Sequence, residues 1–193
     1  MSTTSHASFL FACAASVGSA AAQSLVGDTI LRVSQPQSSG IVGDPQFAVV
    51  TDPGVEFIDS FPFPPGEFRR FNIGATSIRM DNTATWFSPW FDTGHLPSYI
   101  EFRDLDFGDP AWSIGGVNVT WGGGVSIEDD APINYPAFSS NAVIFNADTV
   151  RLYIGPYQFE AGSWVQIDLA IVPAPGAVAM AGVAGMIALR RRR

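Results

Sequence analysis

The sequence predicts an all-β protein, an antiparallel β-sandwich of jelly-roll or Ig-like type, and three observations support this fold class. Short runs rich in Val, Ile, Phe and Trp alternate apolar and polar positions, as in residues 164–171. The 19 glycines and 14 prolines fall mainly between these runs. No window between the two ends of the chain keeps the spacing of an amphipathic helix, which favours antiparallel strands over βαβ units.

We expect strands at residues 25–33, 46–50, 55–58, 68–73, 76–80, 85–87, 99–105, 116–121, 125–127, 142–145, 149–154 and 164–171. The chain divides into a leader at 1–22, one sandwich domain at 23–172 and a tail at 173–193. Apolar residues make up 47% of the chain, and 15 Phe with 5 Trp are enough to fill the core of such a domain. We expect the turn residues Gly122 to Gly124 to close a hairpin.

The charge balance excludes several classes of function. All 18 acidic residues lie between Asp28 and Asp168, together with six arginines, so this stretch has a net charge of −12. A surface this acidic repels polyphosphate, and nucleic-acid binding is therefore not expected. The chain contains no lysine, which excludes a phosphate-loop lysine and a Schiff base. Its one cysteine, Cys13, lies in the leader, so the domain has neither a disulfide nor a catalytic thiol.

The first residues of the chain indicate export. Residues 9–17 form an apolar run that is too short to span a bilayer and suits the helix of a signal peptide. Ala20 and Ala22 supply the small residues that signal peptidase needs, so we place cleavage after Ala22. The segment before the run has no Arg or Lys, which fits this interpretation poorly. Lipid attachment at Cys13 and a buried N-terminal helix are the two alternatives.

The last residues form a three-part tail. Pro173, Ala174 and Pro175 impose an extended backbone through which no helix continues. Residues 177–189 follow without a charge and cover roughly 20 Å as a helix, less than the ~30 Å of a bilayer core. We expect them to form a short transmembrane helix that is held in the inner membrane only transiently. Four positive residues that remain on the cytoplasmic side end the chain: Arg190, Arg191, Arg192 and Arg193.

This tail resembles the PEP-CTERM sorting signal of bacteria that secrete exopolysaccharide. The order of a Pro-x-Pro motif, a short membrane stretch and an arginine cluster is the same, although Ala174 stands where the family usually has Glu. The resemblance covers only residues 173–193. It implies that an exosortase recognises the tail, cuts near Pro173-Ala174-Pro175 and leaves the domain outside the inner membrane, at the cell surface or in the extracellular space. An ordinary anchor that is never processed is the alternative.

A cluster of aspartates is the candidate metal site. Asp104, Asp106 and Asp109 offer hard oxygen ligands on a short stretch of chain, and Ca²⁺ prefers several such ligands on a flexible loop. The spacing departs from that of an EF-hand loop. A solvated strand face that ends in a turn is the plainer interpretation of the same residues. Calcium is the only cofactor that the sequence suggests.

Exposed tryptophans are the candidate ligand-binding residues. Sandwich lectins stack sugar rings on aromatic faces, and Trp86, Trp90 and Trp112 could form such a platform for exopolysaccharide. Trp121 and Trp164 lie in alternating strands, and for them we expect core packing instead.

No catalytic constellation is present in the sequence. Outside the leader there is one histidine, His95, and no Gly-x-Ser-x-Gly motif or zinc-ligand pattern accompanies it. We therefore expect an exported, non-catalytic surface or matrix protein, whose partners are signal peptidase and an exosortase-type enzyme. A carbohydrate-binding module is the first alternative. A secreted glycan hydrolase is the second, and it would need two carboxylates facing each other across a cleft.

Overall fold

The computed structural model describes residues 23–35, 45–62, 65–87, 98–109, 111–127, 136–155 and 157–174. The leader helix expected within 1–22 and the membrane helix expected at 177–189 lie outside these residues. In the described part of the chain, no helix is long and apolar enough to cross a membrane.

The described residues form short strands and a single turn of 3₁₀-helix, η1 (Ser140–Ala142). The strands are β1 (Thr29–Gln35), β2 (Gln46–Val49), β3 (Phe57–Pro62), β4 (Pro65–Gly74), β5 (Ser77–Asn82), β6 (Trp86–Phe87), β7 (Tyr99–Arg103), β8 (Trp112–Gly122), β9 (Val125–Ile127), β10 (Val143–Phe145), β11 (Val150–Tyr153), β12 (Tyr157–Phe159) and β13 (Trp164–Pro173). The predicted all-β class is confirmed.

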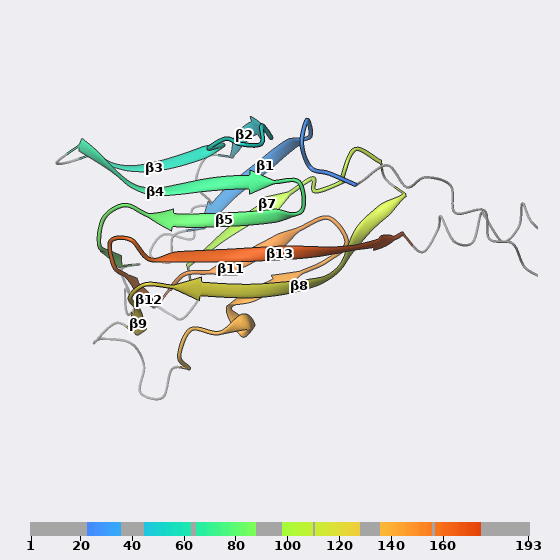
Figure 1. Cartoon of the computed structure of the whole chain (residues 1–193). Coiled ribbons are helices and arrows are strands. Elements are labelled where there is room, and N and C mark those ends of the chain that lie inside the picture. The colour runs from blue at the N-terminus through green and yellow to red at the C-terminus, as the bar shows by residue number, and fades with distance from the viewer. Residues whose placement is uncertain are drawn as a thin grey trace, which may run out of the picture.

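Two five-stranded sheets face each other (Figure 1). The first has the order β10-β11-β7-β1-β2 and the second the order β3-β4-β5-β13-β8. A third, small sheet has the order β6-β12-β9. Neighbouring strands are antiparallel in every pair that the structure describes. The arrangement is that of a β-sandwich.

One apolar core lies between the two large sheets. The ring of Phe102 on β7 packs edge-on against that of Phe71 on β4, with ring centroids 5.5 Å apart. Both side chains are completely buried. Alternate residues of β13 point inward in the predicted pattern, since Val165, Ile167 and Leu169 are buried. The alternation in the sequence therefore identifies the core face of this strand.

A bulge bends the long pair of β8 and β13. The register shifts between Ala170 and Ile171, and Gly115 is the extra residue on β8. A Cβ atom at Gly115 would lie 2.6 Å from Cγ1 of Val172, so glycine is required here by the close approach of that side chain. The bulge allows β8 to remain paired with β13 as far as Trp112 and Pro173.

Three details of the predicted strands are wrong. The expected strand at 99–105 ends at Arg103, because Asp104 has a φ of 63° and leaves the extended conformation. The sequence pattern missed β12, whose three residues are too few to show a period. Gly122 to Gly124 do not close a hairpin, because β8 belongs to a large sheet and β9 to the small one.

The described chain begins and ends at the same end of the sandwich (Figure 1). Leu25 is buried there, and its N–H donates to the carbonyl of Ala75 in the turn between β4 and β5. The end of β13 lies at this end as well, opposite the first residues of β8.

Candidate functional site

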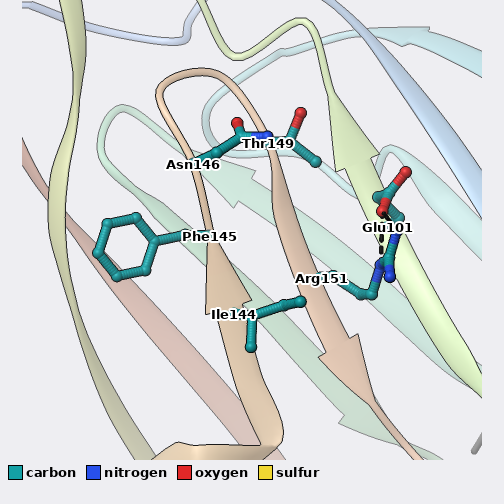
Figure 2. A pocket seen from close by; sticks show the side chains of 6 residues that line it. All are labelled: Glu101, Ile144, Phe145, Asn146, Thr149 and Arg151. Carbon is teal, nitrogen blue, oxygen red and sulfur yellow. Dashed lines mark hydrogen bonds and ion pairs between the residues drawn. The ribbon is translucent and has the colours of Figure 1, made fainter.

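A hollow of about 260 Å³ lies on the first large sheet, over β7, β10 and β11 (Figure 2). Strand pairing places Arg151 between Glu101 on one side and Ile144 on the other. These three residues alternate with the buried residues of their strands, so their side chains point away from the core. The hollow is lined by Glu101, Ile144, Phe145, Asn146, Thr149 and Arg151.

Glu101 organises the polar side of the hollow. Its carboxylate accepts a hydrogen bond from Nε of Arg151 at 2.6 Å and another from Nε of Arg103. The guanidinium carbon of Arg151 lies 4.1 Å from the centre of the Tyr99 ring, which in turn packs against Tyr153. Burial by itself would lower the pKa of Arg151, but its bonds to Tyr153 and Glu101 raise it. Arg151 is therefore charged and held in one position.

The other side of the hollow is apolar. Ile144 lies on the same sheet face as Arg151 and is 47% exposed, which is high for a side chain of this size. Phe145 is 42% exposed, but it pairs with the buried Val150 and its side chain points away from Arg151 (Figure 2). The tight turn from β10 to β11 sits above them. Asn146 donates its backbone N–H to the carbonyl of Thr149 at 3.0 Å, and its side-chain oxygen accepts from the N–H of Asp148. The Thr149 hydroxyl donates to the Asp148 carboxylate at 2.9 Å.

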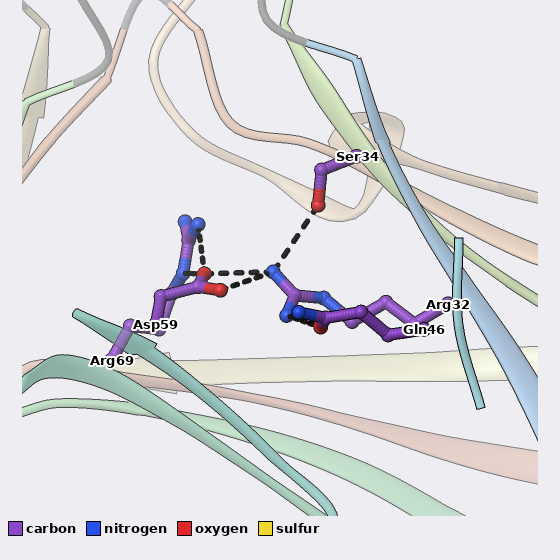
Figure 3. Close-up of polar contacts among 5 residues, drawn as sticks. All are labelled: Arg32, Ser34, Gln46, Asp59 and Arg69. Carbon is purple, nitrogen blue, oxygen red and sulfur yellow. Dashed lines mark hydrogen bonds and ion pairs between the residues drawn. The ribbon is translucent and has the colours of Figure 1, made fainter. Parts of the chain in front are cut away.

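A second ionic cluster is buried between the large sheets (Figure 3). Asp59 on β3 accepts hydrogen bonds from Arg32 on β1 at 2.7 Å and from Nε of Arg69 on β4 at 2.8 Å. Arg32 also donates to Gln46 at 2.8 Å and to Ser34 at 3.1 Å. The cluster ties one sheet to the other, since Arg32 and Asp59 belong to different sheets.

The charges of this buried cluster depend on each other. Burial alone would raise the pKa of Asp59, but Arg69 and Arg32 lower it below its usual value. Burial lowers the pKa of Arg69 to about 10, against the opposite effect of Asp59. Arg32 lies over the ring of Phe71 at 4.5 Å, and its Nε has no hydrogen-bond partner among the described residues. The arrangement supports a structural tie rather than chemistry.

The three predicted calcium ligands lie on an exposed loop after β7. The side chain of Asp106 accepts from the N–H of Gly108 at 3.1 Å, and that of Asp109 accepts from the N–H of Ala111 at 2.8 Å. Asp104 is exposed at the point where the strand ends. Within the described ranges, no three His, Cys, Asp or Glu side chains come together as a metal site. Calcium binding stays a prediction.

Asp28, which the sequence did not single out, lies beside this loop. Its carboxylate accepts from the same Gly108 N–H at 3.0 Å, so two carboxyl groups converge on one donor. Burial, followed by the charge and the hydrogen bond of Asp106, raises the pKa of Asp28 to about 6. Asp28 and Gly108 lie 80 residues apart in the sequence, so no local pattern could have shown that Asp28 belongs to this loop.

The predicted tryptophan platform is not assembled in the described structure. Trp86 begins β6 in the small sheet, whereas Trp112 begins β8 at the other end of the sandwich and packs half-buried against the core. Trp90 lies outside the described residues. The expected core packing is wrong for Trp121, which is 41% exposed with its ring against Phe138 at 5.4 Å.

Trp164 is also not a core residue. It is half-buried on the outer face of the second large sheet, where Arg79 lies over its ring at 4.6 Å. The ring covers Gly122 on the adjacent strand, and a Cβ atom there would lie 2.7 Å from its Nε1. The alternation of β13 thus placed the neighbours of Trp164 correctly but not Trp164 itself.

The predicted sorting motif begins inside the fold. Pro173 is the last residue of β13 and pairs with Trp112, and Ala174 donates its N–H to the carbonyl of Ala111 at 2.7 Å. Pro175 and the arginines from Arg190 to Arg193 lie outside the described residues, as do Ala20 and Ala22.

By its fold, the protein is an all-β protein with an antiparallel β-sandwich. Its surface has a small hollow that both polar and apolar residues line. Comparisons with protein-family models, with curated proteins and with solved structures found no match to this chain.

Proposed function

We propose that this protein is an exported, non-catalytic component of the cell surface or extracellular matrix, with a structural or adhesive role. In this proposal, signal peptidase removes the leader after Ala22, and an exosortase-type enzyme processes the tail. The single observation that carries the proposal is the order of Pro173-Ala174-Pro175, the uncharged residues 177–189 and four terminal arginines.

The arrangement of the ends supports the proposal. Residues 23–28 and the end of β13 lie at one end of the sandwich, so both targeting segments attach on the same side of the domain. A domain exported through its leader and held by its tail would then present its opposite end to the surroundings.

The distribution of charge supports a structural role. All six arginines in the described residues form ion pairs with carboxylates, within one sheet or across the two.

We include a jelly-roll or Ig-like topology in the proposal. It is supported by the way successive segments alternate between the sheets, with β1 and β2 in one, β3 to β5 in the other and β7 again in the first.

Mass spectrometry of fractionated cells tests the proposal. We expect the cell-surface or medium fraction to contain a chain that starts at Gln23 and lacks the last arginines. Replacing Arg190, Arg191, Arg192 and Arg193 by serine should leave the tail uncut and shift the protein to the membrane fraction. A full-length chain in the cytosol, with Met1 and Arg193 attached, would contradict the proposal.

A carbohydrate-binding role is the second candidate function. The hollow over β7, β10 and β11 favours it, because the exposed side chain of Ile144 and fixed hydrogen-bonding groups converge there on one small volume.

A further inference from the structure

We propose that the hollow over β7, β10 and β11 binds one ring of a neutral polysaccharide. The inference rests on the proposed function, because it names a ligand for an extracellular, non-catalytic domain. It moves the binding site from the tryptophans expected from the sequence to residues on β10, β11 and the turn between them.

The chemistry of the two walls fits a sugar ring. A pyranose has one face of C–H groups and a rim of hydroxyls, so it needs an aromatic or aliphatic wall beside hydrogen-bonding groups. The exposed side chain of Ile144 supplies an aliphatic wall, and Asn146, Thr149 and Arg151 supply the hydrogen-bonding groups. Its volume of about 260 Å³ is of the size for one ring rather than a large ligand.

The polar wall is already in place before a ligand arrives. Arg151 is held by Glu101 at 2.6 Å (Figure 2). Its guanidinium carbon also lies 4.1 Å from the centre of the Tyr99 ring. Asn146 and Thr149 are held by the hydrogen bonds of the turn that they form with Asp148. A ligand therefore loses less free energy in ordering these side chains than it would at flexible ones.

The charge of the protein selects a neutral ligand over an acidic one. Residues 28–168 have a net charge of −12, with 18 acidic residues against six arginines. At the hollow, Arg103 and Arg151 share Glu101, and the carboxylate of Asp148 in the adjacent turn offsets the remaining positive charge. An acidic polymer is therefore repelled by the domain without a compensating cationic site.

The test is titration of the full chain with four hexasaccharides, followed by calorimetry. Cellohexaose, maltohexaose and mannohexaose are neutral, and hexagalacturonate is acidic. We expect at least one neutral sugar to bind and hexagalacturonate to bind at least roughly tenfold more weakly than that sugar, a difference of ~1.4 kcal/mol. No binding of any neutral sugar, or tighter binding of hexagalacturonate, would overturn the inference.

Two apolar residues of the same sheet provide matched variants. Ile144→Ala removes the apolar wall of the hollow and should weaken binding about tenfold, because the C–H face of the sugar loses its apolar partner. Ile144→Leu should keep the affinity. Phe47→Ala changes a side chain that is 66% exposed on β2, outside the hollow, and should leave binding unchanged. Equal losses in Ile144→Ala and Phe47→Ala would place the site elsewhere and overturn the inference.

A negative result for sugar binding can be distinguished from a negative result for the proposed export and processing. Binding is measured on purified chain, whereas export and tail processing are measured in cell fractions. An exported chain that binds none of the sugars would keep the proposed function and reject the sugar site.

Discussion

Two carboxylates of this protein are each shared by two arginines, and they differ in where they lie. Asp59 joins Arg32 and Arg69 between the large sheets, with the arginine side chains 3% and 5% exposed. Glu101 joins Arg103 and Arg151 on an outer sheet face, where the arginine side chains are 46% and 30% exposed. The same chemical unit thus occurs once between the sheets and once on an outer face, where the arginines are exposed although the Glu101 side chain itself is only 4% exposed, against 15% for Asp59.

The comparison shows that the surroundings decide what such a unit does. Between the sheets, water cannot replace a lost partner, so each charge requires the others and the unit acts as a tie. On the outer face, water can solvate both arginines, so they depend less on the carboxylate, whereas the Glu101 carboxylate is buried and depends on them. There Glu101 holds the guanidinium of Arg151 in a fixed position at the rim of the hollow.

The largest effect that would test this comparison is expected for Asp59→Asn. Removing the shared carboxylate leaves two buried guanidinium groups without their counter-charge, which should lower the free energy of unfolding by about 3–5 kcal/mol. Urea denaturation measures the change. As a control, replacing Arg32, Asp59 and Arg69 together by Met, Leu and Leu should recover most of the stability. A loss below ~1 kcal/mol in Asp59→Asn would show that the tie is not needed.

A smaller effect is expected for Glu101→Gln. Both arginines regain water when the carboxylate is lost, so the free energy of unfolding should fall by only about 1–2 kcal/mol. The same denaturation experiment applies. If this variant loses as much as Asp59→Asn, exposure of the arginines does not explain the difference between the two units.

Acid titration distinguishes the core unit by its pH window. The pKa of Asp59 is lowered in the folded state, so its contribution to stability is present above the unfolded value of 3.8. It is lost as the pH falls from there through the lower folded pKa. Unfolding free energies measured from pH 6 to pH 2 should therefore fall less steeply in Asp59→Asn than in the natural chain. Parallel curves would contradict this assignment.

Asp28 provides the opposite case, and we expect the smallest effect there. Burial, followed by the charge of the neighbouring Asp106 carboxylate, raises the pKa of Asp28 from 3.8 to about 6. Its contribution is fully present below pH 3.8 and is lost as the pH rises through about 6. Asp106→Asn removes the repulsion but not the burial, so the loss of stability between about pH 4 and pH 6 should become smaller. An unchanged slope in that variant would show that the two carboxyl groups do not interact.

The sequence predicted the elements of this fold better than the contacts between them. The alternation of β13 identified its core face, because burial on one side of a strand repeats every second residue. The partnership of Arg32 with Asp59 could not be foreseen, since these residues lie 27 apart on different sheets. Trp121 follows an apolar alternation but ends β8 beyond the core, so its strand pattern gave the wrong environment.

The hollow was not predicted from the sequence. Sugar contact was predicted for Trp86, Trp90 and Trp112, whereas the hollow is lined by residues such as Glu101, Ile144 and Arg151. The pairing of Glu101 with Arg151 depends on strands that are distant in sequence, 50 residues apart. Only the exposed apolar pair Ile144 and Phe145, directly before a turn, left a local trace in the sequence.

Under the proposed processing of the tail, the hydrogen bond from Ala174 to Ala111 holds part of the segment that the enzyme has to take. An enzyme that takes its substrate as an extended segment would have to compete with β8 for residues 173 and 174. Cleavage at these residues would first require the end of β13 to separate from the start of β8. The folded domain would therefore slow cleavage of its own tail. Variants that weaken the pairing of β8 near Trp112 should be cleaved and released faster.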